Sequence, residues 1–173
     1  MINFINQIIN GLSTGSMYAL VAIGYTMVYG IAKMINFAHG DIIMAGAYFA
    51  LIAMGFVGPI PAILFSIVAT ATLGVLTEKV AYKPLRGKGS LEVLITAIGV
   101  SYLLQNVALL IFGSDTKAFT SVVTMKNITL FDGQLIIPGV AVVTVLACIV
   151  IMIGLSLFIK KTKAGRAMVA VSE

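Results

Sequence analysis

Long uncharged stretches alternate with short charged ones along the chain. No Asp, Glu, Lys or Arg occurs in residues 1–32, 42–77, 93–114 or 133–159. Each stretch can supply the roughly 20 apolar residues that carry a helix across a bilayer. A transmembrane barrel would instead show alternating segments of about ten residues. The pattern therefore predicts an all-α fold, a polytopic bundle of transmembrane helices.

The stretch 42–77 must contain two helices. Its 36 residues would measure about 54 Å as a single helix, while the hydrocarbon core is only about 30 Å thick. Glycine and proline at 55–61 supply the break. Five spans are then expected, at 8–32, 41–57, 60–78, 93–113 and 139–159. Residues 33–58 also allow a re-entrant segment.

Charge in the connecting segments predicts the orientation. The loop 79–92 and the tail 160–173 each carry four basic residues, whereas the loop 114–137 carries two basic and two acidic ones. Basic residues favour the cytoplasmic side, so the loop 79–92 and the tail are expected inside and the loop 114–137 outside, in the periplasm. Counting back places the N-terminus outside. Within the outer loop, Asp132-Gly133 between two short apolar runs indicates a hairpin.

Composition excludes several classes of protein. The chain is 60% hydrophobic and 10% charged, whereas a soluble domain has about 25% charged residues. The net charge of +5 does not indicate nucleic-acid binding, because eight of the eleven basic residues flank spans rather than form a basic face. With a single His and a single Cys, and no nucleotide-binding or catalytic motif, we expect no metal, no cofactor and no catalytic residue.

The densest polar group near the spans comprises Asn36, His39 and Asp41. Two main interpretations are open. Asp41 can cap the helix 41–57, with Asn36 capping or forming a turn, or the group can line a solute path or contact a partner. Metal or proton-relay chemistry is a third interpretation.

Three further sets of small or polar residues lie inside the spans. Gln105 and Asn106 can bond one helix to another or form the wall of a polar path. Thr70 and Thr72 are expected to donate to carbonyls of their own helix. Gly11 and Gly15, with Ser16 beside them, are expected to let the first span pack closely on other protein.

Several motifs in register resemble one known family. They are the segments 12–20 (LSTGSMYAL), 24–31 (GYTMVYGI), 36–41 (NFAHGD), 82–86 (YKPLR) and 162–168 (TKAGRAM). Over essentially the whole chain, the sequence resembles the bacterial branched-chain amino acid ABC transporter permeases, and in particular the first of their two permease subunits.

The resemblance implies a function and a set of partners. The chain would be a permease subunit of an ATP-driven, binding-protein-dependent importer of leucine, isoleucine and valine in the bacterial inner (plasma) membrane. A second permease subunit, two ABC ATPase subunits and a periplasmic substrate-binding protein would be its partners, and the ATPases would hydrolyse ATP. Asn36 to Asp41 would lie near the translocation path. Gly165, Arg166, Ala167 and Met168 would lie in a cytoplasmic coupling segment, 160–173, that contacts an ATPase. On composition alone, that tail is equally a basic membrane-exit flank.

The chain departs from the family in two ways. Val169 stands where members usually carry a second Arg, and members continue beyond Glu173 with further spans. We therefore expect residues 1–173 to be the N-terminal part of a longer single permease domain. Three alternatives are a urea or short-chain amide ABC permease, a truncated non-transporting interaction fragment, and an autonomous channel or carrier.

Overall fold

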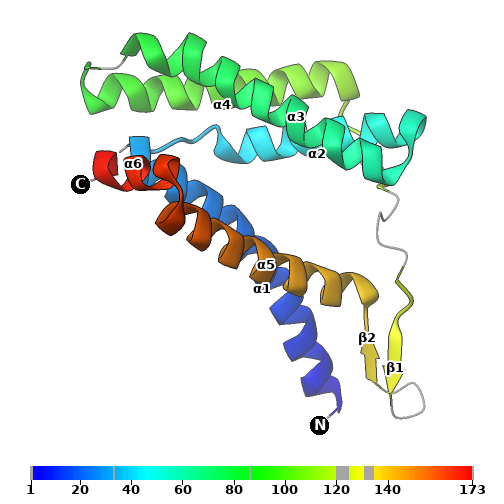
Figure 1. Ribbon diagram of the computed structural model, residues 1–173. Helices are drawn as coiled ribbons and strands as arrows, with labels where there is room; N and C mark the ends of the chain where they lie inside the picture. Colours follow the sequence, from blue (N-terminus) through cyan, green and yellow to red (C-terminus); the bar gives the residue numbers. More distant parts are fainter. Residues whose placement is uncertain (1, 33, 86, 120–124, 131–134, 173) are drawn as a thin grey trace. The chain divides into compact units, whose positions relative to one another are not determined.

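The computed structural model describes residues 2–32, 34–85, 87–119, 125–130 and 135–172. Six α-helices and one two-stranded sheet occur within these residues (Figure 1). The chain divides into two compact units: Met1–Lys33 together with Val123–Glu173, and Met34–Val122. The all-α prediction is confirmed, with one small hairpin added.

The first unit pairs two long helices. α1 (Ile2–Ala32) packs along α5 (Gly139–Lys161), and the short α6 (Lys163–Ser172) follows α5 and contacts both. Within this unit, Ser16 on α1 is 8% exposed and Ala141 on α5 is 5% exposed.

A hairpin precedes α5. β1 (Ile128–Leu130) pairs antiparallel with β2 (Leu135–Ile137), and Thr129 lies opposite Ile136. The predicted hairpin is thus confirmed in its two arms. Its Asp132-Gly133 turn lies outside the described residues.

The second unit is built around a helical hairpin. α2 (His39–Val57) and α3 (Pro59–Thr77) are separated by Gly58 alone, whose φ of 81° suits glycine. The predicted break is therefore confirmed. The helices pack very closely: the Ser66 hydroxyl donates to the Gly46 carbonyl over 2.6 Å, and a Cβ on Gly46 would lie 2.7 Å from Thr70 Oγ1.

The helix after α3 continues further than the sequence indicated. A π-helical segment, Glu78–Tyr82, and a 3-10 turn, Lys83–Leu85, extend it before α4 (Ser90–Phe112) begins. Residues 79–85 were expected in the connecting loop 79–92, which contains Pro84, Gly87 and Gly89. Since Pro84 lies at the very end of the segment, within the 3-10 turn, the helical path reaches it unbroken.

Every predicted span corresponds to a helix. Four helical segments within the described residues have the length and apolarity to cross a membrane: His39–Val57, Pro59–Leu85, Ser90–Phe112 and Gly139–Lys161. α1, with 31 residues, is not among these four. Residues 39–57 form one continuous helix long enough to cross.

Candidate functional site

Asp41 is held by α4 rather than by its own helix. It lies in the first turn of α2, where the N-cap is Ala38 and no side chain caps the helix. Its carboxylate accepts a hydrogen bond from the Ser101 hydroxyl and another, of 3.0 Å, from Gln105 Nε2. The capping prediction for Asp41 is therefore wrong, because the carboxylate is engaged by two donors on α4. We call Asp41, Ser101 and Gln105 the Asp41 cluster.

Asn36 forms the turn that leads into α2. Its side-chain oxygen accepts from the Ala38 amide over 3.1 Å, and its backbone carbonyl accepts from the His39 amide over 3.2 Å. The predicted turn at Asn36 is thus confirmed. The same side-chain oxygen accepts from the Tyr82 hydroxyl over 2.7 Å, so the buried Tyr82 ties this turn to the π-helical segment.

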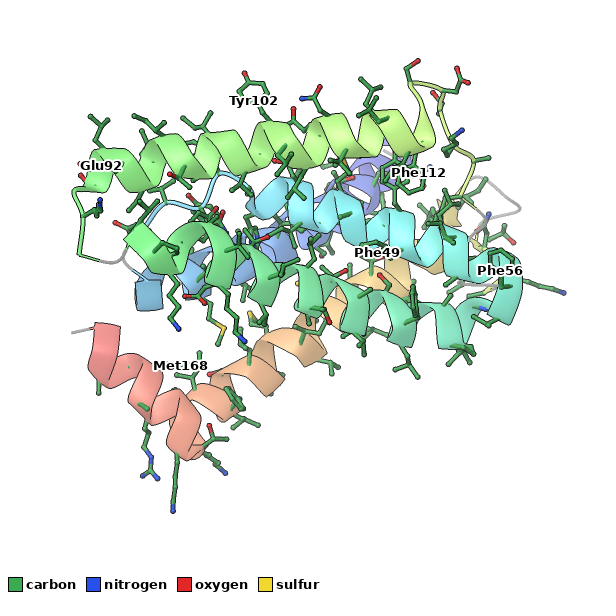
Figure 2. All side chains as sticks on the ribbon, turned by 90° about the horizontal axis from the view of Figure 1, so that it is seen from above. Phe49, Phe56, Glu92, Tyr102, Phe112 and Met168 are labelled. Carbon is green, nitrogen blue, oxygen red and sulfur yellow. The ribbon has the colours of Figure 1, made fainter. Side chains whose placement is uncertain are left out.

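The two amides of α4 have different roles. Gln105 bonds α4 to α2, as one of its two interpretations predicted. Asn106 donates to the Tyr102 carbonyl of its own helix over 2.7 Å, and both amide side chains are exposed. In Figure 2 the Tyr102 side chain points away from α2, on the far side of α4. His39 is the partly buried first residue of α2.

A second contact fixes the register of α2 against α4. The Tyr48 ring stacks on Phe112, with centroids 4.0 Å apart and planes at 10°. Phe112 is the last residue of α4, and its side chain lies against α2 in Figure 2. Because Asp41 to Tyr48 and Gln105 to Phe112 each advance about two turns, α2 and α4 run parallel. In Figure 1, α2 begins part-way along α4.

The segment predicted to contact the ATPase forms α6, and a tight joint attaches it to α5. The Thr162 hydroxyl donates to the Phe158 carbonyl over 2.7 Å and accepts from the Gly165 amide over 2.9 Å. Gly165 is buried, and a Cβ there would lie 2.5 Å from the Ile159 backbone. Arg166 and Ala167 are exposed, and Met168 is partly buried. Thr162 thus ends α5 and caps α6.

Gly11 and Gly15 lie on an exposed face of α1. A Cβ at either position would meet nothing within 4 Å among the described residues. Ser16 beside them is buried and donates to the Leu12 carbonyl over 2.8 Å. Close packing of this glycine face on other protein stays a prediction.

The sequence indicated some of these residues and missed others. Thr72 donates to Val68 of its own helix over 2.8 Å as predicted, whereas the Thr70 hydroxyl is buried beside Gly46 and has no hydrogen-bond partner among the described residues. Ser101 was not singled out, because a lone serine in an apolar span carries no pattern of its own. Tyr82 stood within a motif, but nothing local indicated its bond to Asn36.

Comparison with known proteins identifies the family. Residues 7–173 match the family model described as "Branched-chain amino acid transport system / permease component". The chain belongs to this family. It is therefore a multi-pass membrane permease component and not the ATP-hydrolysing part of a transporter, as predicted.

The curated relatives are longer than this chain, which matches about half to three fifths of their length. The high-affinity branched-chain amino acid transport system permease protein BraD of Pseudomonas aeruginosa is 40% identical over 184 residues, which cover 99% of this chain and 60% of BraD. The corresponding LivH of Escherichia coli K12 is 39% identical over 197 residues, 98% of this chain and 59% of LivH. A probable LivH of Methanocaldococcus jannaschii is 30% identical over 169 residues, 91% of this chain and 51% of the relative. No solved structure matches.

Proposed function

We propose that the chain works in the permease subunit of an ATP-driven, binding-protein-dependent importer of leucine, isoleucine and valine. The observation that carries this proposal is the 40% identity to BraD across 99% of the chain. BraD and LivH are both named as permeases of high-affinity branched-chain amino acid transport systems. The partners would be a second permease subunit, two ABC ATPase subunits and a periplasmic binding protein.

The proposed topology has five crossings, with the N-terminus outside and the C-terminus in the cytoplasm. α1 supplies the first crossing: it has 31 residues and no charged side chain. The parallel course of α2 and α4 supports alternating directions for α2, α3 and α4. The basic residues of 79–92 and 160–173 favour the cytoplasm for both segments.

The translocation path is proposed to run beside the start of α2 and the two amide side chains of α4. Asn36, His39, Asp41, Gln105 and Asn106 would line it. Supporting this, Asp41 is only partly buried and both amides of α4 are exposed, although they lie within segments apolar enough to span a membrane. Polar side chains in such segments usually face a bundle interior or a water-filled cavity.

The coupling segment is proposed to be α6, with Gly165, Arg166, Ala167 and Met168 at the ATPase contact. Exposure of Arg166 and Ala167 leaves them accessible to a partner, and the capped joint at Thr162 holds α6 at a set angle to α5. A movement of the ATPase would then pass to α5 through a stiff connection.

Uptake measurements test the function. In cells whose gene for this permease is deleted, we expect uptake of labelled leucine through this system to be lost and to return with the full gene, while labelled urea uptake stays constant. The reverse pattern would favour the urea permease. Leucine uptake unchanged by the deletion would refute the proposal.

A capture assay tests the coupling segment and the interaction-fragment alternative. The tagged permease should retain the ATPase subunits, and deletion of 160–173 should abolish that retention while membrane insertion continues. Retention that survives the deletion would refute the assignment of α6. Retention without any leucine transport would favour the non-transporting fragment.

A further inference from the structure

The Asp41 carboxylate lies beside the middle of a membrane span. Ser101, which donates to it, is the central residue of α4 (Ser90–Phe112). Gln105, one turn further along α4, donates to the same carboxylate. α4 has the length and apolarity of a span, so its central residue marks the interior of the bilayer. Asp41 therefore lies beside the middle of α4, although it belongs to the first turn of α2.

The groups that hold this carboxylate do not neutralise it. Ser101 offers a hydroxyl and Gln105 an amide, and neither is charged. A carboxylate has about four acceptor positions, so the two bonds leave others available. Asp41 is only partly buried and Gln105 is exposed. Because a charge facing lipid is costly, this face of α2 and α4 must look toward protein or water.

We propose that the Asp41 cluster binds the ammonium group of the amino acid during its passage. This inference rests on the proposed function and specifies the part of the solute that is recognised. Ser101 and Gln105 fix the carboxylate in one orientation, and the remaining acceptor positions of Asp41 receive the ammonium protons.

The chemistry of the solutes fits one shared site of this kind. Leucine, isoleucine and valine differ in their apolar side chains but share a primary ammonium group with three donors. Hydrogen bonds between an ammonium and a carboxylate are shorter and roughly twice as strong as neutral ones. A carboxylate taken out of water also requires a cationic partner to offset the cost of its desolvation. A single carboxylate would thus serve all three solutes.

The decisive variant is Asp41→Asn in the complete transporter, with the full-length permease, its partner subunit, both ATPases and the binding protein in proteoliposomes. Asparagine keeps one oxygen, which can still accept from Gln105, and its Nδ2 can donate to the Ser101 hydroxyl oxygen, so the contact between α2 and α4 persists while the charge disappears. We expect leucine uptake to fall about tenfold or more. The thermal midpoint of the complex should remain at its wild-type value.

Thr72→Val is the matched control. It also removes a polar group from a spanning helix, but Thr72 is exposed and, among the described residues, donates to Val68 of its own helix, so leucine uptake should be unchanged. Uptake by Asp41→Asn within twofold of wild type would overturn the inference and leave the proposed function intact. A wild-type complex that takes up no leucine would refute the proposed function instead.

If Asp41→Asn does not assemble, a binding measurement on the wild-type complex tests whether the ammonium group is recognised. Labelled leucine is bound to the purified complex without binding protein and displaced by two analogues. Leucinamide keeps the ammonium group and should displace it, whereas 4-methylpentanoate lacks that group and should not. Equal displacement by 4-methylpentanoate, or no leucine binding at all, would overturn the inference.

Discussion

The Asp41 cluster and the joint between α5 and α6 are both held by hydrogen bonds of a side chain, over very different distances along the chain. Asp41 accepts from residues 60 and 64 positions away, whereas Thr162 bonds only to residues three and four positions away. The joint fixes the angle between α5 and α6 through neighbouring residues, independently of how the other helices pack. The cluster exists only when two separate helices adopt one register.

The largest effect is expected from breaking the local joint with Gly165→Val. A side chain there would collide with the Ile159 and Phe158 backbone at 2.5 Å, and backbone cannot move aside as a flexible side chain can. We expect α6 to leave its position and leucine uptake to fall about tenfold or more, since overpacking costs about 1–3 kcal/mol. Uptake and capture of the ATPase subunits measure this.

Gly154→Ala provides the control for this variant. Gly154 lies in the preceding helix, α5, where a Cβ would meet nothing within 4 Å among the described residues. It should transport normally. If Gly165→Val also transports normally, the joint does not set the direction of α6. The proposed difference between the local joint and the long-range Asp41 cluster would then be wrong.

An intermediate effect is expected from Thr162→Val, which keeps the shape and removes both bonds of the hydroxyl. Loss of an N-cap costs about 1 kcal/mol, so α6 should fray and uptake should fall a few-fold. Thr162→Ser retains the hydroxyl and should restore uptake. Thr144→Val removes a hydroxyl that, in the part of the chain the structure describes, bonds to Val140 within α5, and it should leave uptake unchanged. A Thr162→Ser variant as defective as Thr162→Val would contradict the capping role.

The smallest effect is expected from Tyr82→Phe, which removes one long-range bond in the second unit. The Tyr82 hydroxyl donates to Asn36 from 46 residues away, and such a bond contributes about 1 kcal/mol. Asn36 keeps its bond to Ala38, so the turn should survive. The thermal midpoint of the purified complex should fall by a few degrees, with leucine uptake nearly unchanged. Tyr18→Phe alters a 71% exposed ring and serves as the control; equal midpoints would contradict a structural role for Tyr82.

Local patterns predicted the helices well. The spacing of charged residues predicted five spans, and each of them is a helix in the structure. The glycine and proline residues around Gly58 predicted the break between α2 and α3. The turn at Asn36 was also predictable, since an asparagine side chain commonly bonds to the amide two residues on.

Register between helices was not predictable in the same way. Helices that are apolar nearly all round have no polar face to indicate which side meets which neighbour. Asp41 therefore suggested a cap, which needs only its own helix, and Ser101 gave no signal. The continuation of the helix to Leu85 was missed for a related reason: glycine and proline indicate where a helix ends only to within a few residues.

The single-residue connection at Gly58 bears on how this protein enters the membrane. α2 and α3 follow one another with no loop between them, and residues 42–77 contain no charged side chain. No hydrophilic segment has to be carried across the bilayer when this pair inserts. We expect the two helices to leave the insertion machinery as a preformed hairpin, with Gly46 already packed against Thr70 before α4 is made.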